Sequence, residues 1–318
     1  MRYAVLAPPE IPIPVKGYAG IELITQNFAE EMSKGHDVTL YCNQAESGIH
    51  KGISMYPSDL SVLAKYDYTF DFTHQKSAAG YFAKENYVAT AFLTDALSNI
   101  NDVFPTKAVR DGFHSDGPVI YPGIKNVYQY TDAKADYLLY LGRISKFKRP
   151  DIAVQVANRL GKRITVAGHV GAFSKFPDPT YDSVVKHMCK SRGHEFVENP
   201  TLEQKVEMLR HAQALIVPSD WSMINSQESF GIVCVEALLS GTPIIVSGDG
   251  GLKEIVTQEC GYVCRTLEEY VEAVKRIEHG AIEPRKCLER GEYFTSPRMV
   301  ADYLALSSLQ QTTQSRSA

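Results

Sequence analysis

The stretch from residue 214 to residue 247 decides the fold class of this chain. Residues 214–217 read Ala-Leu-Ile-Val, a short apolar run typical of a buried parallel strand. Residues 228–239 read Glu-Ser-Phe-Gly-Ile-Val-Cys-Val-Glu-Ala-Leu-Leu, and from Gly231 onward this run suits a buried helix. A second apolar run, Ile-Ile-Val-Ser, follows at residues 244–247. A strand, a helix and another strand in this order predict an α/β protein with parallel sheets.

The same alternation of short apolar runs and helical patterns extends through both halves of the chain. The other predicted strands are 3–7, 37–41, 70–73, 88–92, 119–121, 137–141 and 163–167. The other predicted helices are 21–32, 151–160, 201–212, 267–277 and 297–310. Helices that alternate with parallel strands cover both faces of a sheet, and ligands bind where such strands end.

The alternation restarts after residues 121–124, Tyr-Pro-Gly-Ile, which predicts two doubly wound, Rossmann-like domains. We place the first domain at residues 1–128 and the second at 129–295. A last helix is expected at 296–309, and the polar tail 310–318 is expected to be disordered.

Composition and charge exclude several classes of protein. The chain has 318 residues with 44 % hydrophobic and 22 % charged residues, an ordinary globular balance. Residues 1–125 hold 10 basic and 14 acidic residues, which leaves 23 of each for residues 126–318. Neither half is basic, so nucleic acid is not an expected partner. No apolar run approaches the roughly 18 residues that a transmembrane helix needs.

The N-terminus and the cysteines favour a cytoplasmic protein, either free or peripheral at the membrane. The first apolar run, residues 3–7, is too short for a signal peptide and is expected to be a strand. None of the six cysteines forms a Cys-x-x-Cys pair or has the spacing of a zinc site, so reduced thiols are expected.

The first candidate site is the pair of carboxylates Glu228 and Glu236. The predicted helix begins near Phe230 or Gly231, and a helix N-terminus attracts a phosphate. Gly231 would let a ligand approach that backbone closely. Glu236 would lie roughly 9 Å along the axis at about 1.5 Å per residue. A diphosphate at the helix start could then have a sugar near Glu228 and a ribose near Glu236. On spacing alone, the alternative that is favoured is an acidic residue that suits the dipole at the helix start and a second glutamate that faces solvent.

Two further loops follow predicted strands. Ser-Gly-Asp-Gly-Gly at 247–251 opens a helix and could be an anion nest or only a tight turn. The loop after residues 137–141 carries four cations that could neutralise a diphosphate, or could be a solvated basic loop. These cations are Arg143, Lys146, Lys148 and Arg149.

In order and setting, these sites resemble family 4 of the glycosyltransferases, retaining enzymes of the GT-B fold. The motifs that carry the resemblance are Gly142-Arg143 with Lys148, Pro218-Ser219, Glu228 with Glu236, and Gly250-Gly251 with Glu254. They cover about residues 137–264. The resemblance implies two Rossmann-like domains that face a central cleft.

The resemblance also implies roles for the residues that match the motifs. Arg143 and Lys148 would hold the donor diphosphate, Glu228 would touch the donor sugar, and Glu236 would bind the ribose hydroxyls. Phe230, Gly231 and Ile232 would supply backbone contacts. Such enzymes need no metal ion or other cofactor, and no metal site is expected here.

The first half matches the family less closely. In place of the family's Gly-Gly-x-Glu it reads Ala-Gly-Ile-Glu, so Gly20 matches as a donor contact and the first glycine does not. By the resemblance, His74 would contact the donor sugar near the reaction centre; a lone histidine is otherwise more often structural. The last helix would cross back onto the first domain. The loop around Trp221 would shape the sugar pocket or cover the core.

The function expected from this resemblance is transfer of a sugar from a nucleotide-diphosphate sugar to an acceptor hydroxyl, with retention of the anomeric configuration and without a metal ion. A UDP- or GDP-sugar is the expected donor for this hexosyltransferase. The acceptor would be a saccharide, a lipid-linked saccharide or a small metabolite. Two alternatives are a sugar-nucleotide epimerase of the same fold and a catalytically weak subunit that only binds the nucleotide sugar.

Overall fold

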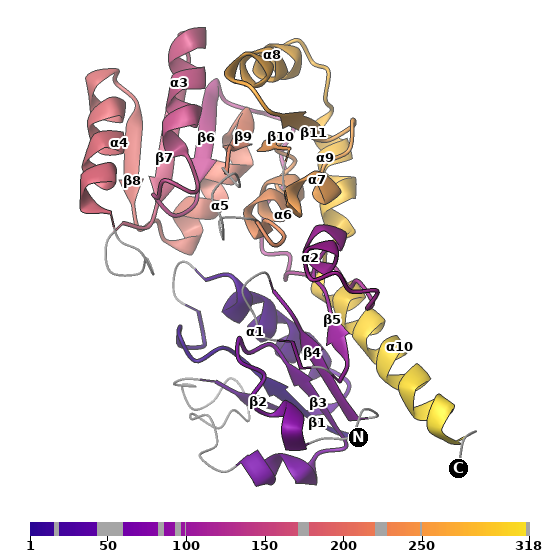
Figure 1. Ribbon diagram of the computed structural model, residues 1–318. Coiled ribbons are helices and arrows are strands. Elements are labelled where there is room, and N and C mark those ends of the chain that lie inside the picture. Colours follow the sequence, from indigo (N-terminus) through magenta and orange to yellow (C-terminus); the bar gives the residue numbers. More distant parts are fainter. Residues whose placement is uncertain are drawn as a thin grey trace. The chain divides into compact units, whose positions relative to one another are not determined.

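The structure is a computed structural model, and it contains two compact α/β units. It describes residues 1–15, 19–42, 60–81, 86–92, 97–98, 100–170, 178–219, 228–248 and 250–315. Unit 1 consists of Met1–Lys125 and Phe294–Ala318, and unit 2 consists of Asn126–Tyr293. Each unit contains one sheet whose strands are all parallel, which confirms the predicted fold class (Figure 1).

Unit 1 has a five-stranded sheet in the order β2-β1-β3-β4-β5. Its strands are β1 (Arg2–Leu6), β2 (Asp37–Tyr41), β3 (Tyr68–Asp71), β4 (Tyr87–Thr90) and β5 (Asp102–Val103). The strand order reverses between β1 and β3, so the loops after these two strands border the usual ligand crevice of such a sheet.

The two faces of the unit 1 sheet bury different side chains because alternate residues of a strand point to opposite faces. On one face, Phe28 of α1 (Ile21–Met32) packs edge-on against Phe70 of β3 and against Tyr303 of α10 (Ser296–Ser315). On the other face, Ala4 and Leu6 of β1 join a cluster that includes residues of the short 3₁₀ helices η1 (Leu60–Lys65) and η2 (Ala79–Tyr81). A short helix, α2 (Lys107–Gly112), follows β5.

The end of the chain differs from the sequence prediction. Helix α10 continues to Ser315, whereas an irregular tail was expected from Gln310. Residues 310–315 contain no glycine or proline that would stop a helix already begun, and adding a residue to an existing helix costs little.

Unit 2 has a six-stranded sheet in the order β11-β10-β9-β6-β7-β8. Its strands are β6 (Tyr137–Leu141), β7 (Arg163–Gly168), β8 (Glu195–Glu198), β9 (Ala214–Val217), β10 (Ile244–Ser247) and β11 (Gly261–Cys264). Numbered within the unit and read from β8, this is the order 3-2-1-4-5-6 of the dinucleotide-binding fold.

Two groups of helices cover the faces of the unit 2 sheet (Figure 1). In the first group, α3 contacts α4 and α8; in the second, α6 contacts α5, α7 and α9. The bounds are α3 (Pro150–Leu160), α4 (Pro179–Ser191), α8 (Leu267–Glu278), α5 (Leu202–His211), α6 (Ile232–Leu239), α7 (Leu252–Ile255) and α9 (Pro284–Glu292). Both faces are therefore buried, which explains why β6, β9 and β10 are continuously apolar.

Most predicted elements are present, with two kinds of difference. The strand expected at 119–121 is only an isolated bridge between Val119 and Phe104. The strands expected at 70–73 and 88–92 begin earlier, as β3 and β4. All six cysteines are free and buried. In the part of the chain that the structure describes, no helix has the length and apolar character to cross a membrane.

Candidate functional site

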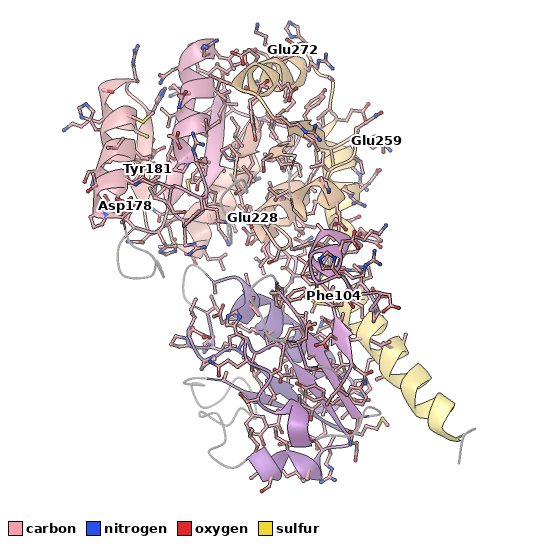
Figure 2. All side chains as sticks on the ribbon, in the orientation of Figure 1. Phe104, Asp178, Tyr181, Glu228, Glu259 and Glu272 are labelled. Atoms are coloured by element: carbon pink, nitrogen blue, oxygen red, sulfur yellow. The ribbon has the colours of Figure 1, made fainter. Side chains whose placement is uncertain are left out.

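The strand order of unit 2 reverses between β6 and β9, and both strands are followed by the charged loops identified from the sequence. Arg143 and Lys148 follow β6, while Ser219 and Glu228 follow β9. Figure 2 marks Glu228 in unit 2, and the arrows of Figure 1 show the direction of the strands. A reversal of this kind opens a crevice at the carboxyl ends of the strands, where ligands of such sheets bind.

The loop after β6 is held in place by backbone contacts to the end of β7. Gly142 N–H donates to the carbonyl of Ala167 at 3.1 Å, and Ile144 N–H donates to the carbonyl of His169 at 3.1 Å. Gly168 must be a glycine here because a Cβ atom would lie 1.8 Å from the carbonyl oxygen of Gly142. This close approach positions the loop that carries Arg143 and Lys148.

Two of the four predicted diphosphate cations are committed to other carboxylates. Lys146 pairs with Asp178 at 2.7 Å, and Arg149 pairs with Asp151 at 3.0 Å. The Tyr181 hydroxyl also donates to Asp151, at 2.5 Å, and Figure 2 labels Asp178 and Tyr181 at the start of α4. Lys146 and Arg149 therefore have carboxylate partners of their own, and the assignment of Arg143 and Lys148 to a diphosphate stays a prediction.

Lys148 and Glu228 form an ion pair at the reversal point. The Lys148 ammonium donates to Glu228 Oε1, which also accepts from the Ser219 hydroxyl at 3.1 Å. Both charged side chains are mostly buried, with 17 % and 15 % exposed. Burial by itself would raise the pKa of Glu228, but Lys148, Ser219 and Arg143 outweigh it and hold that pKa below its ordinary value. The carboxylate is thus ionised and ready to accept hydrogen bonds at neutral pH.

The glycine turn after β10 packs directly against the backbone of Glu228. Gly251 N–H donates to the Glu228 carbonyl at 2.8 Å. Gly250 has a φ of +60°, and a Cβ atom there would lie 2.6 Å from the same carbonyl oxygen. The turn that was predicted as a possible anion nest therefore also holds Glu228 in place.

Phe230, Gly231 and Ile232 form the start of α6, as predicted within one residue. Gly231 is the N-cap with a φ of +102°, and Phe230 is buried. A Cβ atom on Gly231 would lie 2.4 Å from the side chain of Leu252. The glycine is thus required by the backbone and by packing, in addition to the ligand approach that its position suggests.

Glu236 lies one turn into α6 and makes two hydrogen bonds that the sequence did not reveal. The Tyr128 hydroxyl donates to Glu236 Oε1 at 2.6 Å, and the Lys205 ammonium donates to the same oxygen at 2.6 Å. Burial raises the pKa of Tyr128, and the neighbouring Glu236 carboxylate raises it further. The phenol therefore stays protonated and can donate this hydrogen bond. Glu236 is therefore not a solvent-facing carboxylate, because only 4 % of its side chain is exposed.

The two predicted residues of unit 1 lie at the strand reversal of that unit. Gly20 is the N-cap of α1, in the segment that follows β1, and His74 follows β3. The φ of Gly20 is −104°, and no described heavy atom lies within 4 Å of where its Cβ would be. Burial raises the pKa of the nearby Glu22, and His74 opposes that rise, so the histidine and this carboxylate interact electrostatically.

A buried polar network fixes the loop that carries His74. Thr73 N–H and the Tyr87 hydroxyl donate to the two oxygens of Asp71, at 2.8 and 2.6 Å. The Lys76 ammonium donates to the carbonyl of Thr90 at 2.8 Å and also to the carbonyl of Thr73. Burial raises the pKa of Asp71 in spite of the nearby Lys76 cation. The loop is therefore held on both sides of His74.

The structure thus brings Arg143, Lys148 and Glu228 together, with Glu236 further along the helix that follows Glu228. Gly20 and His74 lie in unit 1. The loop around Trp221 lies outside the described residues. Among the described residues, no group of three or more histidine, cysteine, aspartate or glutamate side chains could hold a metal ion.

Solved structures with the same fold cover nearly the whole chain. AviGT4, a glycosyltransferase involved in avilamycin A biosynthesis, aligns over 98 % of both chains with a TM-score of 0.76 and 19 % identity. Sucrose-phosphate synthase from Thermosynechococcus elongatus aligns over 98 % of this chain and 100 % of its own, with a TM-score of 0.77 and 15 % identity. Anabaena HepE in complex with UDP and glucose covers 97 % of this chain and 99 % of its own, with a TM-score of 0.72 and 15 % identity. These similarities show the GT-B fold.

Curated relatives match a smaller part of the chain. The D-inositol 3-phosphate glycosyltransferase of Mycobacteroides abscessus is 30 % identical over 213 residues, which are 63 % of this chain and 46 % of that protein. The corresponding enzyme of Mycolicibacterium smegmatis is 33 % identical over 123 residues, 38 % of this chain and 26 % of that protein. The matched region of this chain thus spans less than half the length of these relatives.

The family model described as "Glycosyl transferases group 1" matches residues 129–293, which are 165 of the 318 residues and just over half of the chain. The matched region contains Arg143, Lys148, Glu228 and Glu236. The chain therefore belongs to the group 1 glycosyl transferases and has the GT-B fold.

Proposed function

We propose that this enzyme transfers a sugar, with retention of the anomeric configuration and without a metal ion, from a nucleotide-diphosphate sugar to an acceptor hydroxyl. A UDP- or GDP-sugar is the proposed donor, and HepE, a neighbour in fold, was solved with UDP. The acceptor class is a saccharide, a lipid-linked saccharide or a small metabolite, and the proposed location is the cytoplasm.

The observation that carries this proposal is the Lys148–Glu228 pair at the strand reversal of unit 2. A nucleotide sugar presents an anionic diphosphate directly beside a neutral ring rich in hydroxyl groups. Lysine is suited to the first group and an ionised carboxylate to the second. A cation and a carboxylate in contact at one ligand crevice therefore match the two chemically different halves of such a donor.

Buried hydroxyl groups beside the crevice fit the same interpretation. Ser145 Oγ, in the loop after β6, and Ser247 Oγ, at the end of β10, are buried and have no hydrogen-bond partner within the described part of the chain. Buried hydroxyl groups are nearly always paired, so a bound ligand or ordered water is expected to satisfy them. Both lie at the carboxyl ends of strands, where the diphosphate is proposed to bind.

In the proposed reaction, the bond between the anomeric carbon and the diphosphate oxygen breaks, and its electron pair stays on that oxygen. Arg143 and Lys148 stabilise the negative charge that develops on the leaving diphosphate. The acceptor oxygen bonds to the anomeric carbon from the face that the diphosphate leaves, and the acceptor hydroxyl passes its proton to the departing diphosphate oxygen. Glu228 holds the donor sugar, Glu236 holds the ribose, and His74 contacts the sugar near the reacting carbon.

The test compares two lysines of the same loop. Thermal-shift screening against UDP-, GDP- and ADP-sugars would first identify the donor, since a ligand that binds only the folded state raises its stability. Lys148→Met should then lower kcat by about 100-fold or more, the usual cost of losing a group that stabilises transition-state charge. Lys146→Met is the matched control, because Lys146 is 62 % exposed and pairs with Asp178 instead.

Four outcomes would contradict the proposal. Equal activity of Lys148→Met and the wild type would remove the assigned role of Lys148. An inverted anomeric centre in the product, observed by NMR, would refute retention, and loss of activity in EDTA that added Mg²⁺ restores would refute metal independence. An epimerised donor that accumulates without any acceptor would replace transfer with epimerisation.

A further inference from the structure

Glu236 is held by a cation from a different helix. Lys205, in the first turn of α5, reaches Oε1 of Glu236 in α6, and the Tyr128 hydroxyl reaches the same oxygen. The Lys205 ammonium also lies 5.8 Å from the centre of the Tyr128 ring, at a distance suited to a cation–π contact. Two separate segments of unit 2 therefore converge on one carboxylate oxygen of a third segment, α6.

The burial of this carboxylate makes its cation necessary. Only 4 % of the Glu236 side chain and 18 % of the Lys205 side chain are exposed. A buried carboxylate without a nearby positive charge is strongly disfavoured in its ionised form. The ionised form is the one that accepts hydrogen bonds with both of its oxygens.

The two contacts also determine which oxygen a ligand can use. Both donors reach Oε1, and among the described residues no hydrogen bond to Oε2 is found. With one oxygen anchored by two groups, rotation of the carboxylate is restricted, and Oε2 is kept in a constant position as an acceptor. A fixed acceptor of this kind lowers the ordering cost of binding ribose hydroxyls.

We propose that Lys205 is a positioning residue for the donor: together with Tyr128 it fixes the orientation of the Glu236 carboxylate so that this group can accept the two ribose hydroxyls. The inference rests on the proposed function, in which Glu236 binds the ribose. Lys205 acts through Glu236 and makes no contact of its own with the nucleotide. Its loss should therefore weaken binding of the donor and leave the chemical step nearly unchanged.

The experiment measures the affinity of the full chain for UDP, GDP and ADP and for the 2′,3′-dideoxy form of the nucleotide that binds best. Lys205→Met should weaken binding of the ribonucleotide by about 10- to 100-fold, the range typical when a binding group loses its orienting partner. Binding of the dideoxynucleotide should change by less than about 2-fold, because that ligand lacks the hydroxyl groups that Glu236 would accept. In transfer assays of Lys205→Met, the KM for the nucleotide-sugar donor should rise, while kcat stays within a few-fold of the wild-type value.

Two variants separate this role from a general effect on folding. Lys205→Arg keeps the charge and should recover most of the ribonucleotide affinity. Lys162→Met removes another buried lysine of unit 2, one that pairs with Asp136 and Glu278 and is 8 % exposed. That control should lower the melting temperature through the loss of its ion pairs, and it should leave both nucleotide affinities unchanged.

The outcomes distinguish failure of the Lys205 role from failure of the proposed function. If Lys205→Met binds the ribonucleotide as tightly as the wild type, the positioning role is refuted while the nucleotide site stands. If the affinity for the ribonucleotide and for the dideoxynucleotide falls equally, Lys205 contacts the base or the diphosphate directly, and the inference is also refuted. If none of the three nucleotides binds the wild type, the proposed function fails and the role of Lys205 falls with it.

Discussion

Replacement of Gly250 by alanine should damage the candidate site through the backbone alone. Gly250 has a φ of +60°, and a Cβ atom there would lie 2.6 Å from the carbonyl oxygen of Glu228. Ordinary van der Waals contact begins at about 3.4 Å, so the two segments must separate by several tenths of an ångström. That carbonyl also accepts the hydrogen bond from Gly251 N–H at 2.8 Å. The separation would therefore stretch or break this bond and move Glu228.

The magnitude follows from two contributions. A left-handed conformation costs a residue with a Cβ atom about 1–2 kcal/mol relative to glycine. A lost hydrogen bond that leaves a buried group unpaired costs about 1–3 kcal/mol. We expect Gly250→Ala to lower the free energy of unfolding of unit 2 by about 2–5 kcal/mol, the sum of the two contributions. For a unit of this size, each kcal/mol lowers the melting temperature by about 2–4 °C.

The matched control is Gly161→Ala. Gly161, the C-cap residue of α3, has a φ of +65°, and a Cβ atom there meets no described heavy atom within 4 Å. It should therefore show only the conformational cost of about 1–2 kcal/mol. Calorimetric melting measures stability, and kcat/KM with the identified donor measures the displacement of Glu228, which could cost up to about 100-fold. If Gly250→Ala melts together with Gly161→Ala and keeps full kcat/KM, the inferred contact with Glu228 is wrong.

Three other predictions concern single side chains. The pKa of Glu228 is held below its ordinary value, so its charge stabilises the folded state at pH values above the unfolded-state pKa of about 4.3. This stabilisation is lost as pH falls through the folded-state pKa. The difference in stability between the wild type and Glu228→Gln should therefore shrink as pH falls from 6 to 3, as measured by urea titrations. Burial lowers the pKa of Lys134 to about 8, so the unfolded state binds more protons than the folded state between about pH 8 and 10.4. The stability of the wild type should therefore rise with pH in this range, and that of Lys134→Met should rise less, as followed by circular dichroism. Tyr303→Phe removes the hydroxyl group that lies 2.5 Å from Thr90 Oγ1 in unit 1 and should cost about 1–2 kcal/mol in urea unfolding, whereas an unchanged midpoint would show that this bond adds nothing.

The sequence was most informative where strands are buried on both faces. The predicted strands at 137–141, 214–217 and 244–247 have the bounds of β6, β9 and β10. These central strands are apolar at nearly every position, because helices cover both faces of the sheet. Strong hydrophobic runs therefore predicted the centre of unit 2 and the loops that follow its strands.

Edge elements lacked that signal. Strand β8, at one edge of the unit 2 sheet, begins and ends with an exposed glutamate and was not predicted. Helix α4, which contacts β8, buries only Val185 and Cys189, so its hydrophobic periodicity is weak. An edge strand or a half-exposed helix needs few apolar residues because one of its sides faces water, so its sequence carries a weak hydrophobic pattern.

The charged residues of the site show a sharper limit of sequence reasoning. Arg143, Lys146, Lys148 and Arg149 are indistinguishable as cations within one loop, yet their partners differ. Lys146 reaches Asp178 just before α4, whereas Lys148 reaches Glu228, eighty positions further along the chain. Which cation remains near the ligand crevice depends on these distant carboxylates, and only the packing of the strands determines their positions.

Lys205 is a second residue whose partner cannot be predicted from the neighbouring sequence. The capping box of Thr201 and Gln204 predicted the start of α5, and the structure confirms both of its hydrogen bonds. This local signal places Lys205 in the first turn of the helix, where a lysine is ordinarily a solvated residue that opposes the helix dipole. A cation in such an unfavourable position is explained if its charge is required elsewhere, and the buried carboxylate of Glu236 supplies that requirement. A lysine in an electrostatically unfavourable position of its own helix therefore points to a partner elsewhere in the fold that needs its charge, and here that partner is Glu236.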